Sequence, residues 1–449
     1  MRRVAVLTMA LSLLTMLILA IVPIRPVAAE DAAPTSSLRK TVESLIAQLD
    51  SNTLAERANA ERSLLELGPD VLTYLPAPEL TPSVAARDAV KRIRLQLERR
   101  AARESAQASH VDLQGDVSLA DCLQAITAQT RNRVELSPAA KPLADTISRV
   151  DWNHTPFWDC LDLLCQSHQL RPAFDVKQGV LLLQPWAAAD PPELAVQRSG
   201  PYRLAVLSVD VRPIVGNSSN HLLRISGKLA LEPRLRPLFL HFKAADLNVD
   251  GTDLTPLRIW NPAATYELPV SDAGREVPLQ FDYLLPADDD RTAIDLSGRL
   301  AVQLAAGTER VVFDQTAQSA GAVRRRGGVT VRLRDVSFEP LADERLRAEI
   351  KVSVGYDAGG PAFESHRTWM FHNAVYFEEK TGQRVEFSDY DTSQQANGAV
   401  GVDYRWDNLP GPATRYHFVY EAPTLILDLP LDVKLSGVPI KRPKDVPRR

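Results

Sequence analysis

Hydrophobic and polar positions alternate with a period of two through much of the chain after residue 199. The runs at 294–302 and 425–435 show this most clearly. Turn residues such as Asp250 and Gly251 separate the alternating runs. A period of two matches β-strands with one buried face, and frequent turn residues match short antiparallel connections. The pattern therefore predicts antiparallel strands throughout the C-terminal half.

The same half contains an internal similarity. Residues 200–213 align without gaps on residues 327–340. Two copies of one alternating pattern predict two tandem antiparallel β-sandwiches, which we place at 199–318 and 322–440. A short basic tail, 441–449, follows the second copy.

Before residue 105 the hydrophobic residues recur every three or four positions, as they do on one face of a helix. The first such face consists of Leu38, Val42, Leu45, Ile46 and Leu49. Thr53 and Glu56 have the spacing of a capping box, which predicts that a second helix begins directly after Thr53. Thr81 and Pro82 suit the start of a third helix. We therefore expect a helical segment over residues 38–104.

Residues 108–186 combine both periods, in the order strand, helix, strand, strand, helix, strand, strand. The two helices begin with similar sequences, Leu-Ala-Asp-Cys-Leu from Leu119 and Phe-Trp-Asp-Cys-Leu from Phe157. Ser118 and Asp121 have capping-box spacing at the start of the first helix. The repeated strand–helix–strand pattern predicts a small α+β domain.

Three parts of the chain resemble known families. The stretch from Leu54 to Gly68, with its Ala-Glu-Arg and Leu-Leu-Glu-Leu-Gly motifs, resembles HEAT-like helical repeats of bacterial envelope proteins. The strand–helix–strand halves of 108–186 resemble the short N-terminal domain of secretins and TonB-dependent receptors. The tandem β modules resemble uncharacterised β-rich modules of bacterial secreted proteins. The second resemblance implies a protein–protein or signalling adaptor without catalysis.

The first thirty residues have the order of a secretory signal peptide. Arg2 and Arg3 precede an uncharged run, and small residues lead up to Ala29. We expect cleavage after Ala29, hence a periplasmic or extracellular protein with no membrane insertion after cleavage. The alternative is that residues 1–29 remain as an anchor, because the uncharged run approaches the roughly 17–25 residues of a spanning helix.

Composition narrows the class further. The chain has 449 residues, of which 24% are charged and 45% hydrophobic, so it has enough apolar material for several globular domains. Three cysteines exclude a disulfide scaffold. A formal charge of −4 gives no indication of a nucleic-acid partner.

Motifs for catalysis or metal binding are weak. Asp246, Asn248 and Asp250 match the first half of a calcium loop, but the position that needs a bidentate acid is Leu257. Three histidines are spaced too widely for a typical zinc site: His366, His372 and His417. The sequence contains no Walker loop, zinc-protease motif, C-x-x-C pair or nucleophile elbow. We therefore predict no catalytic residues, no metal and no cofactor.

Cys122 and Cys160 occupy equivalent places in the two similar halves of the α+β domain. Both lie on hydrophobic helix faces, so both side chains should point into one core. In an oxidising compartment they are candidates for a disulfide, if their Cα atoms come within roughly 4.4–6.8 Å. Two alternatives remain: Cys165 is a competing partner, and all three could be buried free thiols.

These observations indicate a non-enzymatic, modular envelope protein that acts in protein–protein interaction or scaffolding, with an envelope protein as its partner. A first alternative is a carbohydrate-binding protein that uses aromatic side chains of the second β-sandwich. A second is a hydrolase whose carboxylates come from separate strands, about 5–10 Å apart in one cleft.

Overall fold

The computed structural model describes residues 32–442 except 78–79, 82, 176–179, 188–191, 251–255, 272–274, 357–372 and 397–398. The expected signal peptide and its cleavage site at Ala29 lie outside the described residues, as do His366 and His372. The chain forms two compact units, one up to Leu95 and one from Gln96 onward.

The first unit is helical. It contains α1 (Ala32–Gln48), α2 (Leu54–Glu66), the short 3-10 helix η1 (Pro69–Thr73) and the first part of α3 (Val84–Ser105). Its interior includes Val42 and Leu49 on α1, Leu64 on α2, and Val90 and Ile93 on α3. Val42 and Leu49 belong to the hydrophobic face that the sequence predicts for the first helix. None of the described helices is both long and apolar enough to cross a membrane.

The helix starts differ in detail from the predicted caps. The Thr53 side chain makes no capping hydrogen bond. The Ser51 hydroxyl donates to the Glu56 carboxylate instead, and it accepts the Thr53 backbone N–H at 3.1 Å. At α3 the Ser83 hydroxyl accepts the Ala86 N–H at 3.0 Å, two residues later than predicted. Ser83 thus caps α3 in place of Thr81, while the first turn of α2 has no side-chain cap from Thr53.

The second unit begins with the rest of α3 and the α+β domain. The domain consists of β1 (His110–Ser118), α4 (Leu119–Thr130), β2 (Val134–Leu136), β3 (Ile147–Pro156), α5 (Phe157–His168), β4 (Leu170–Phe174) and β5 (Leu181–Pro185). β1 and β3 form an antiparallel pair, and β2, β5 and β4 form a three-stranded sheet. The Ser118 hydroxyl accepts the Asp121 N–H at 3.2 Å, as the capping box predicts. The helices and strands enclose one core.

Two five-stranded antiparallel sheets follow. The first is ordered β11, β13, β8, β7, β6, and the second β20, β21, β17, β16, β15. The strands of the first are β6 (Ala195–Ser199), β7 (Tyr202–Ile214), β8 (Asn217–Leu231), β11 (Arg258–Ile259) and β13 (Glu276–Pro286). Those of the second are β15 (Val323–Arg326), β16 (Val329–Pro340), β17 (Arg345–Tyr356), β20 (Asp389–Ala396) and β21 (Ala399–Pro410).

The two sheets share an irregularity. A register shift lies between Val206 and Ser208 on β7, and another lies between Leu333 and Asp335 on β16. The two shifts fall at equivalent positions of the gap-free alignment. A β-bulge of this kind bends and twists a strand locally, so both sheets are bent at the same point.

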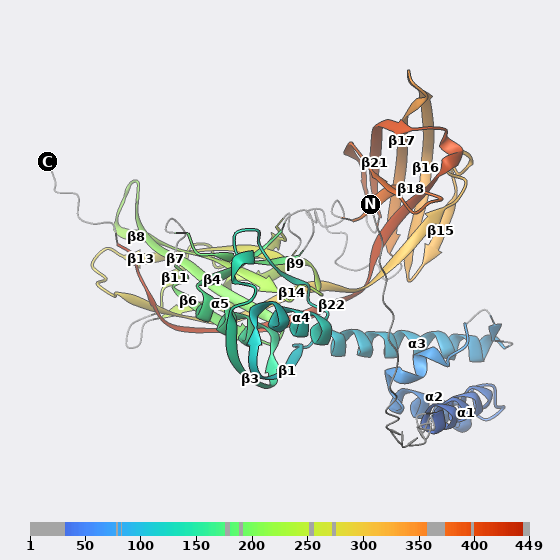
Figure 1. Ribbon diagram of the computed structural model, residues 1–449, viewed down its shortest axis with the longest axis horizontal. Helices are drawn as coiled ribbons and strands as arrows, with labels where there is room; N and C mark the ends of the chain where they lie inside the picture. Colours follow the sequence, from blue (N-terminus) through green and yellow to red (C-terminus); the bar gives the residue numbers. More distant parts are fainter. Residues whose placement is uncertain are drawn as a thin grey trace, which may run out of the picture. The chain divides into compact units, whose positions relative to one another are not determined.

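A third, larger sheet contains strands from both halves of the sequence. Its order is β12, β9, β14, β22, β18, β19, with β10 also paired to β14. The bounds are β9 (Arg236–Lys243), β10 (Leu247–Asp250), β12 (Thr265–Pro269), β14 (Ala293–Phe313), β18 (Val375–Glu379), β19 (Arg384–Glu386) and β22 (Tyr416–Pro439). β14 and β22 pair antiparallel along nearly their whole length, from Ala293 opposite Pro439 to Phe313 opposite Phe418. Figure 1 shows these two long strands side by side.

The β14–β22 ladder contributes to two separate cores. Its even-numbered β14 residues, such as Leu300 and Val302, enter the core with the first five-stranded sheet. Odd-numbered residues, such as Val311 and Phe313, enter the core with the second. Because successive side chains of a strand point to opposite faces, the two cores contact opposite faces of the ladder.

The end of the chain therefore completes the first core rather than the second. Five buried residues of the second half of β22 pack there: Leu427, Leu431, Val433, Leu435 and Val438. The predicted second module, 322–440, includes these residues, but they pack in the first core. The alternating run at 425–435 does form a strand, as part of β22. The chain is mostly β, with a few helices and several sheets, as expected.

We expect Leu431→Ala to destabilise the first core. Leu431 is 2% exposed, and removing a buried leucine side chain costs about 2–5 kcal/mol. Hydrogen exchange followed by mass spectrometry should show loss of protection mainly in β7 and β8. The matched control is Leu333→Ala in the second core, which should expose β16 and β17 instead. Loss of protection in β16 and β17 for Leu431→Ala would contradict the packing of the end of β22 in the first core.

Candidate functional site

A fully buried carboxylate joins the α+β domain to the first five-stranded sheet. Glu232, just after β8, is 0% exposed. It accepts the Ser109 backbone N–H at 2.9 Å, the Ser109 hydroxyl at 2.6 Å and the Asn132 amide at 3.0 Å. The Arg234 guanidinium supplies its countercharge at 2.7 Å. A buried charge needs this degree of pairing, so the joint tolerates only one arrangement of its parts.

Arg234 extends the joint to the end of α3. Its guanidinium donates to the backbone carbonyls of Ser105, the last residue of that helix, and of Gln107, two residues later. Its own backbone N–H donates to the Asn132 side chain at 2.9 Å. One arginine thus ties the helix end, the α+β domain and the β half together.

A second ionic cluster lies along α5. The Arg203 side chain is 6% exposed and pairs with Asp162 of α5 at 3.0 Å and with Glu193 at 2.7 Å. Burial acts to lower the pKa of Arg203, but the hydrogen bond that Arg203 donates to Glu193 and the charge of Asp162 outweigh it, so the pKa is raised. Arg198 adds contacts to Asp159 and Asp162. The arginine therefore stays charged inside the contact.

Apolar contact completes the attachment. Trp158 of α5 is 1% exposed, and its indole N–H donates to the Pro201 carbonyl at 3.0 Å. By contrast α4 has an ordinary exposed face, including Asp121, Gln124 and Gln129. The β half therefore covers one side of α5 and leaves α4 open to solvent.

Three hydrophobic side chains of the α+β domain remain exposed, one on β3, one on α5 and one directly after β5. They are Ile147, Leu163 and Trp186, with exposed fractions of 60%, 51% and 40%. The hydroxyl of Ser148, next to Ile147, lies 2.6 Å from His168 Nε2. The Trp186 backbone N–H donates to the Gln169 carbonyl at 3.2 Å. We call these three residues the α5-end surface.

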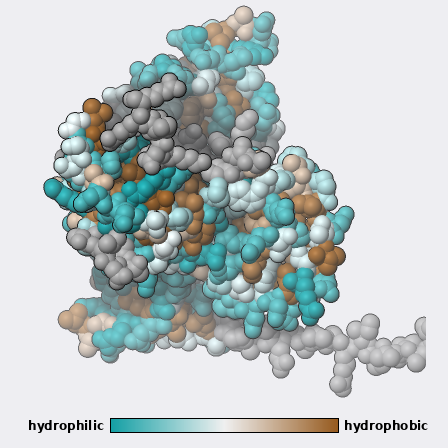
Figure 2. Space-filling view, turned by 90° about the vertical axis from the view of Figure 1, so that its left-hand side faces the viewer, coloured by the Kyte–Doolittle hydropathy of each residue, from teal (hydrophilic) through white to brown (hydrophobic). Residues whose placement is uncertain are grey.

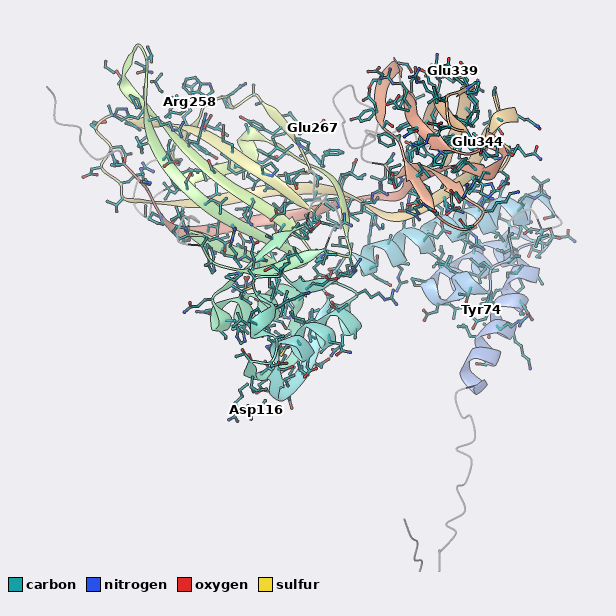
Figure 3. The ribbon with its side chains drawn as sticks, turned by 45° about the horizontal axis from the view of Figure 1, so that its top comes forward. Tyr74, Asp116, Arg258, Glu267, Glu339 and Glu344 are labelled. Atoms are coloured by element: carbon teal, nitrogen blue, oxygen red, sulfur yellow. The ribbon has the colours of Figure 1, made fainter. Side chains whose placement is uncertain are left out.

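Other exposed hydrophobic residues are scattered. On the face drawn in Figure 2, hydrophobic residues lie among hydrophilic ones. The side chains labelled in Figure 3 are polar examples from several elements, including Asp116 on β1 and Glu339 on β16. Isolated exposed apolar residues are normal on any protein surface, so three on one small domain are the informative feature.

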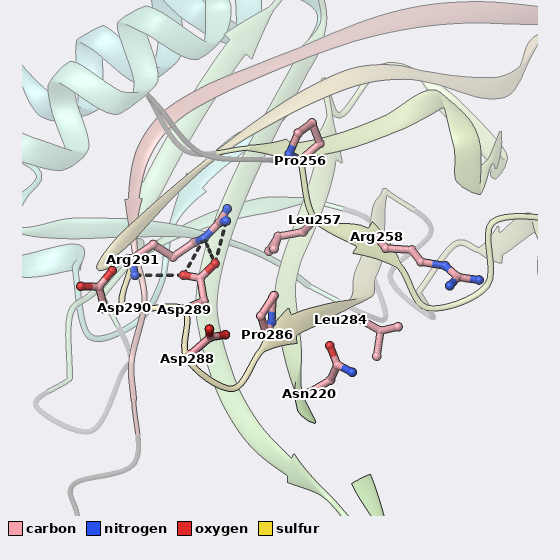
Figure 4. Close-up of a pocket in the computed structure, with 10 residues that line it drawn as sticks. All are labelled: Asn220, Pro256, Leu257, Arg258, Leu284, Pro286, Asp288, Asp289, Asp290 and Arg291. Atoms are coloured by element: carbon pink, nitrogen blue, oxygen red, sulfur yellow. Dashed lines mark hydrogen bonds and ion pairs between the residues drawn. The ribbon is translucent and has the colours of Figure 1, made fainter. Parts of the chain in front are cut away.

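A cleft of about 540 Å³ lies at one end of the first β module. Apolar residues of its lining are Pro256, Leu257, Leu284 and Pro286. Its polar lining residues are Asn220, Arg258, Asp288, Asp289, Asp290 and Arg291. Figure 4 shows the acidic residues on the turn that follows Pro286. The three acids come from one turn, not from separate strands as a strand-borne hydrolase site would require.

Two charged residues of the cleft, Asp289 and Arg291, neutralise each other. Asp289 and Arg291 pair at 2.8 Å, and both side chains are largely buried. Burial acts to raise the pKa of Asp289, but hydrogen bonds from Arg291 outweigh it and hold the pKa below its usual value. Arg442 donates to the carbonyls of Asp289 and Arg291. The pair therefore stabilises the turn.

The three cysteines are buried free thiols. Cys122 and Cys160 are each 0% exposed, as their helix faces predict. Cys122 and Cys160, the candidate disulfide pair, are unbonded thiols in the structure, and the Cys160 sulfur lies 3.6 Å from the Thr155 carbonyl just before its own helix. The disulfide itself stays a prediction for the protein in an oxidising compartment. Burial raises the pKa of Cys122, Cys160 and Cys165, that of Cys160 to about 12.

The half calcium loop is part of the sheet. Asn248 and Asp250 lie on β10, paired with β14, while residues 251–255 are outside the described chain. Leu257, where a twelfth-position acid would be needed, is 8% exposed and belongs to the first core. Within the described residues, no group of three or more His, Cys, Asp or Glu side chains is placed to hold a metal ion.

The aromatic residues considered for sugar stacking mostly belong to the second core. Phe377, Tyr404, Trp406, Tyr416 and Tyr420 are at most 1% exposed and pack there. Tyr376 is also fully buried, and Tyr390 is 37% exposed. A sugar ring needs an open aromatic face, so the buried rings cannot serve as a stacking platform.

Sequence reasoning missed the joint. Glu232 is one of 56 acidic residues, and it follows a strand without any motif that marks it. The Glu-Pro-Arg sequence at 232–234 is the only local signal. A carboxylate and an arginine on either side of a proline indicate a turn, but not its burial.

We expect Glu232→Ala to lower the free energy of unfolding of the second unit by about 3–5 kcal/mol, because it leaves the partly buried Arg234 guanidinium without its countercharge and the Asn132 amide without its acceptor. Chemical denaturation would measure this. The control is Asp432→Ala, which removes an exposed pair with Arg299 and should cause no measurable loss. Equal effects of both changes would contradict the role of the joint.

We expect the three thiols to resist labelling in the folded protein. Their raised pKa values keep them protonated at pH 8, and the thiolate is the reactive form. Labelling with a maleimide at that pH should be slow before denaturation and complete after it. Rapid modification of Cys160 in the native state would contradict the assigned helix face.

Comparison with known proteins adds no relationship to this geometry: no protein-family model matches the chain, and no curated protein matches it significantly.

Proposed function

We propose that this protein is a non-enzymatic scaffold of the bacterial cell envelope. Its α+β domain would bind a protein partner through the α5-end surface, formed by Ile147, Leu163 and Trp186. The observation that carries the proposal is that three large hydrophobic side chains are exposed on one small domain that is held by a buried ionic joint.

The domain resemblance supports this assignment. Adaptor domains of secretins and TonB-dependent receptors act through protein contacts, and the same strand–helix–strand pattern occurs at 108–186. The signal-like segment at 1–29 supports export to the periplasm or the cell exterior. In this proposal residues 38–104 are a HEAT-like segment that adds a further contact surface.

The β half would serve as the frame. We interpret its two cores as two β-sandwiches that arose by duplication and now share one sheet. The equivalent strand orders and the equivalent bulges at Val206 and Leu333 support a duplication. A frame of this kind suits a scaffold, because the Glu232 joint transmits its orientation to the α+β domain.

The α5-end surface has the composition of a small interface centre. Trp186 is large and amphipathic, and the Arg171 guanidinium lies 5.9 Å from its ring centroid. Tryptophan and arginine are enriched among residues that dominate binding energy at protein interfaces. A hydrophobic centre with a polar border is the usual arrangement of such interfaces.

Site-specific photo-crosslinking in the native envelope tests this function. A benzoylphenylalanine at Leu163 should give a discrete protein adduct, and Ile147→Ala with Trp186→Ala should abolish it. The control position is Val215, an exposed hydrophobic residue at the turn between β7 and β8, which should not give the same adduct. Adducts that do not depend on Ile147 and Trp186 would contradict the proposal.

A further inference from the structure

The second half of β22 bonds to the first β module and not to its own. Residues Ile426 to Pro439 pair with β14 from Ala305 back to Ala293. We call residues 426–442 the C-terminal arm. Beyond this ladder, the Gln197 side chain on β6 makes two hydrogen bonds with the arm. Its amide N–H donates to the Asp432 carbonyl at 2.8 Å, and its amide oxygen accepts the Lys434 backbone N–H at 2.7 Å.

The last residues of the arm continue the same attachment. The Lys441 N–H donates to the Val209 carbonyl at 2.7 Å, and the Ile440 N–H donates to the Thr292 carbonyl at 2.8 Å. Every arm contact named here is therefore to residues of the first module. These contacts depend on the chemistry of the arm and not on which copy of the chain supplies it.

The arm is connected to the second module through a strained residue. Leu425 has a φ of +49°, a left-handed conformation that is rare for a large side chain. Gly307 lies opposite the preceding residue, Thr424, and a Cβ added to Gly307 would be 2.6 Å from the Thr424 hydroxyl and 3.4 Å from the Leu425 side chain. The hinge must therefore turn in a confined space, at the point where β22 leaves one core and enters the other.

Strain at Leu425 favours separation of the arm from the first module. Separation leaves a site on the first module that only the arm sequence fills, and we call this site the vacancy. The vacancy is the free edge of β14 over 293–305 together with the apolar space filled by Leu427, Leu431 and Leu435. Exposed strand edges readily pair with another chain. Exchange of an identical element between copies keeps the native contacts, so its main costs are those of association.

We propose that two copies of this chain dimerise by reciprocal exchange of the C-terminal arm, residues 426–442. In the dimer each arm fills the first module of the other copy, and Leu425 can relax into an extended conformation. The first half of β22, Tyr416 to Thr424, stays in its own second module.

Two cysteine pairs across the β14–β22 ladder distinguish the arrangements in the full chain. Arg299 and Asp432 are directly opposite, both highly exposed, and Asp432 lies on the arm. Arg310 and Glu421 are directly opposite on the part of the ladder that stays in the second module. Each pair is replaced by cysteines in a separate variant, and oxidised after equilibration at low and at high protein concentration.

The exchange predicts a disulfide-linked dimer from Arg299→Cys with Asp432→Cys at high concentration, and an intrachain bond at low concentration. Arg310→Cys with Glu421→Cys should give only intrachain bonds at both concentrations. Non-reducing electrophoresis reads the result, with the unaltered chain as the blank for its buried thiols. Intrachain bonds from both pairs at every concentration would overturn the proposal, as would interchain bonds from both.

Leu425→Gly is the independent test, because glycine adopts a positive φ without strain and no new cysteine is needed. Relief of strain stabilises the closed monomer. It should therefore lower the dimerisation constant, given as the association constant of two monomers, by about tenfold or more in sedimentation-velocity ultracentrifugation. Leu429→Ala on the arm, which keeps the hinge, is the control for altered packing. An unchanged or higher dimerisation constant for Leu425→Gly would show that the hinge does not drive exchange.

Discussion

The β half depends on the pairing of β14 with β22. The ladder runs from Ala293 opposite Pro439 to Phe313 opposite Phe418, and side chains from its two faces enter two different cores. Neither core is complete without both strands. The two β modules are therefore coupled by main-chain hydrogen bonds and by packing, which a flexible linker between independent domains could not provide.

The joint at Glu232 extends this coupling to the α+β domain. The partners of this fully buried carboxylate come from the α+β domain, through Ser109 and Asn132, and from the β half, through Arg234. Arg234 in turn donates to Ser105 at the end of α3. The Arg203 cluster and Trp158 add a second and third contact along α5. Polar groups thus specify the orientation, while Trp158 contributes the apolar area.

Much of the local structure could be predicted from the sequence. The faces that bury Val90, Cys122 and Cys160, the cap at Ser118 and the alternating strands all follow from short-range patterns. The pairing of strands could not be predicted in this way. Alternation at 425–435 shows that one face is buried, but it carries no information on which of two similar cores receives it. The burial of Glu232 likewise depends on partners about 100 or more residues away.

The shared ladder also determines when the first module can be finished. Leu300 cannot pair with Leu431 until the ribosome has added that residue, and most of the second module lies between the two in sequence. Contacts with such large sequence separation form slowly, because a long loop must close first. During synthesis the edge of β14 is unpaired until the last strand appears. A nascent chain therefore exposes this edge to chaperones and to neighbouring chains for longer than two independent modules would.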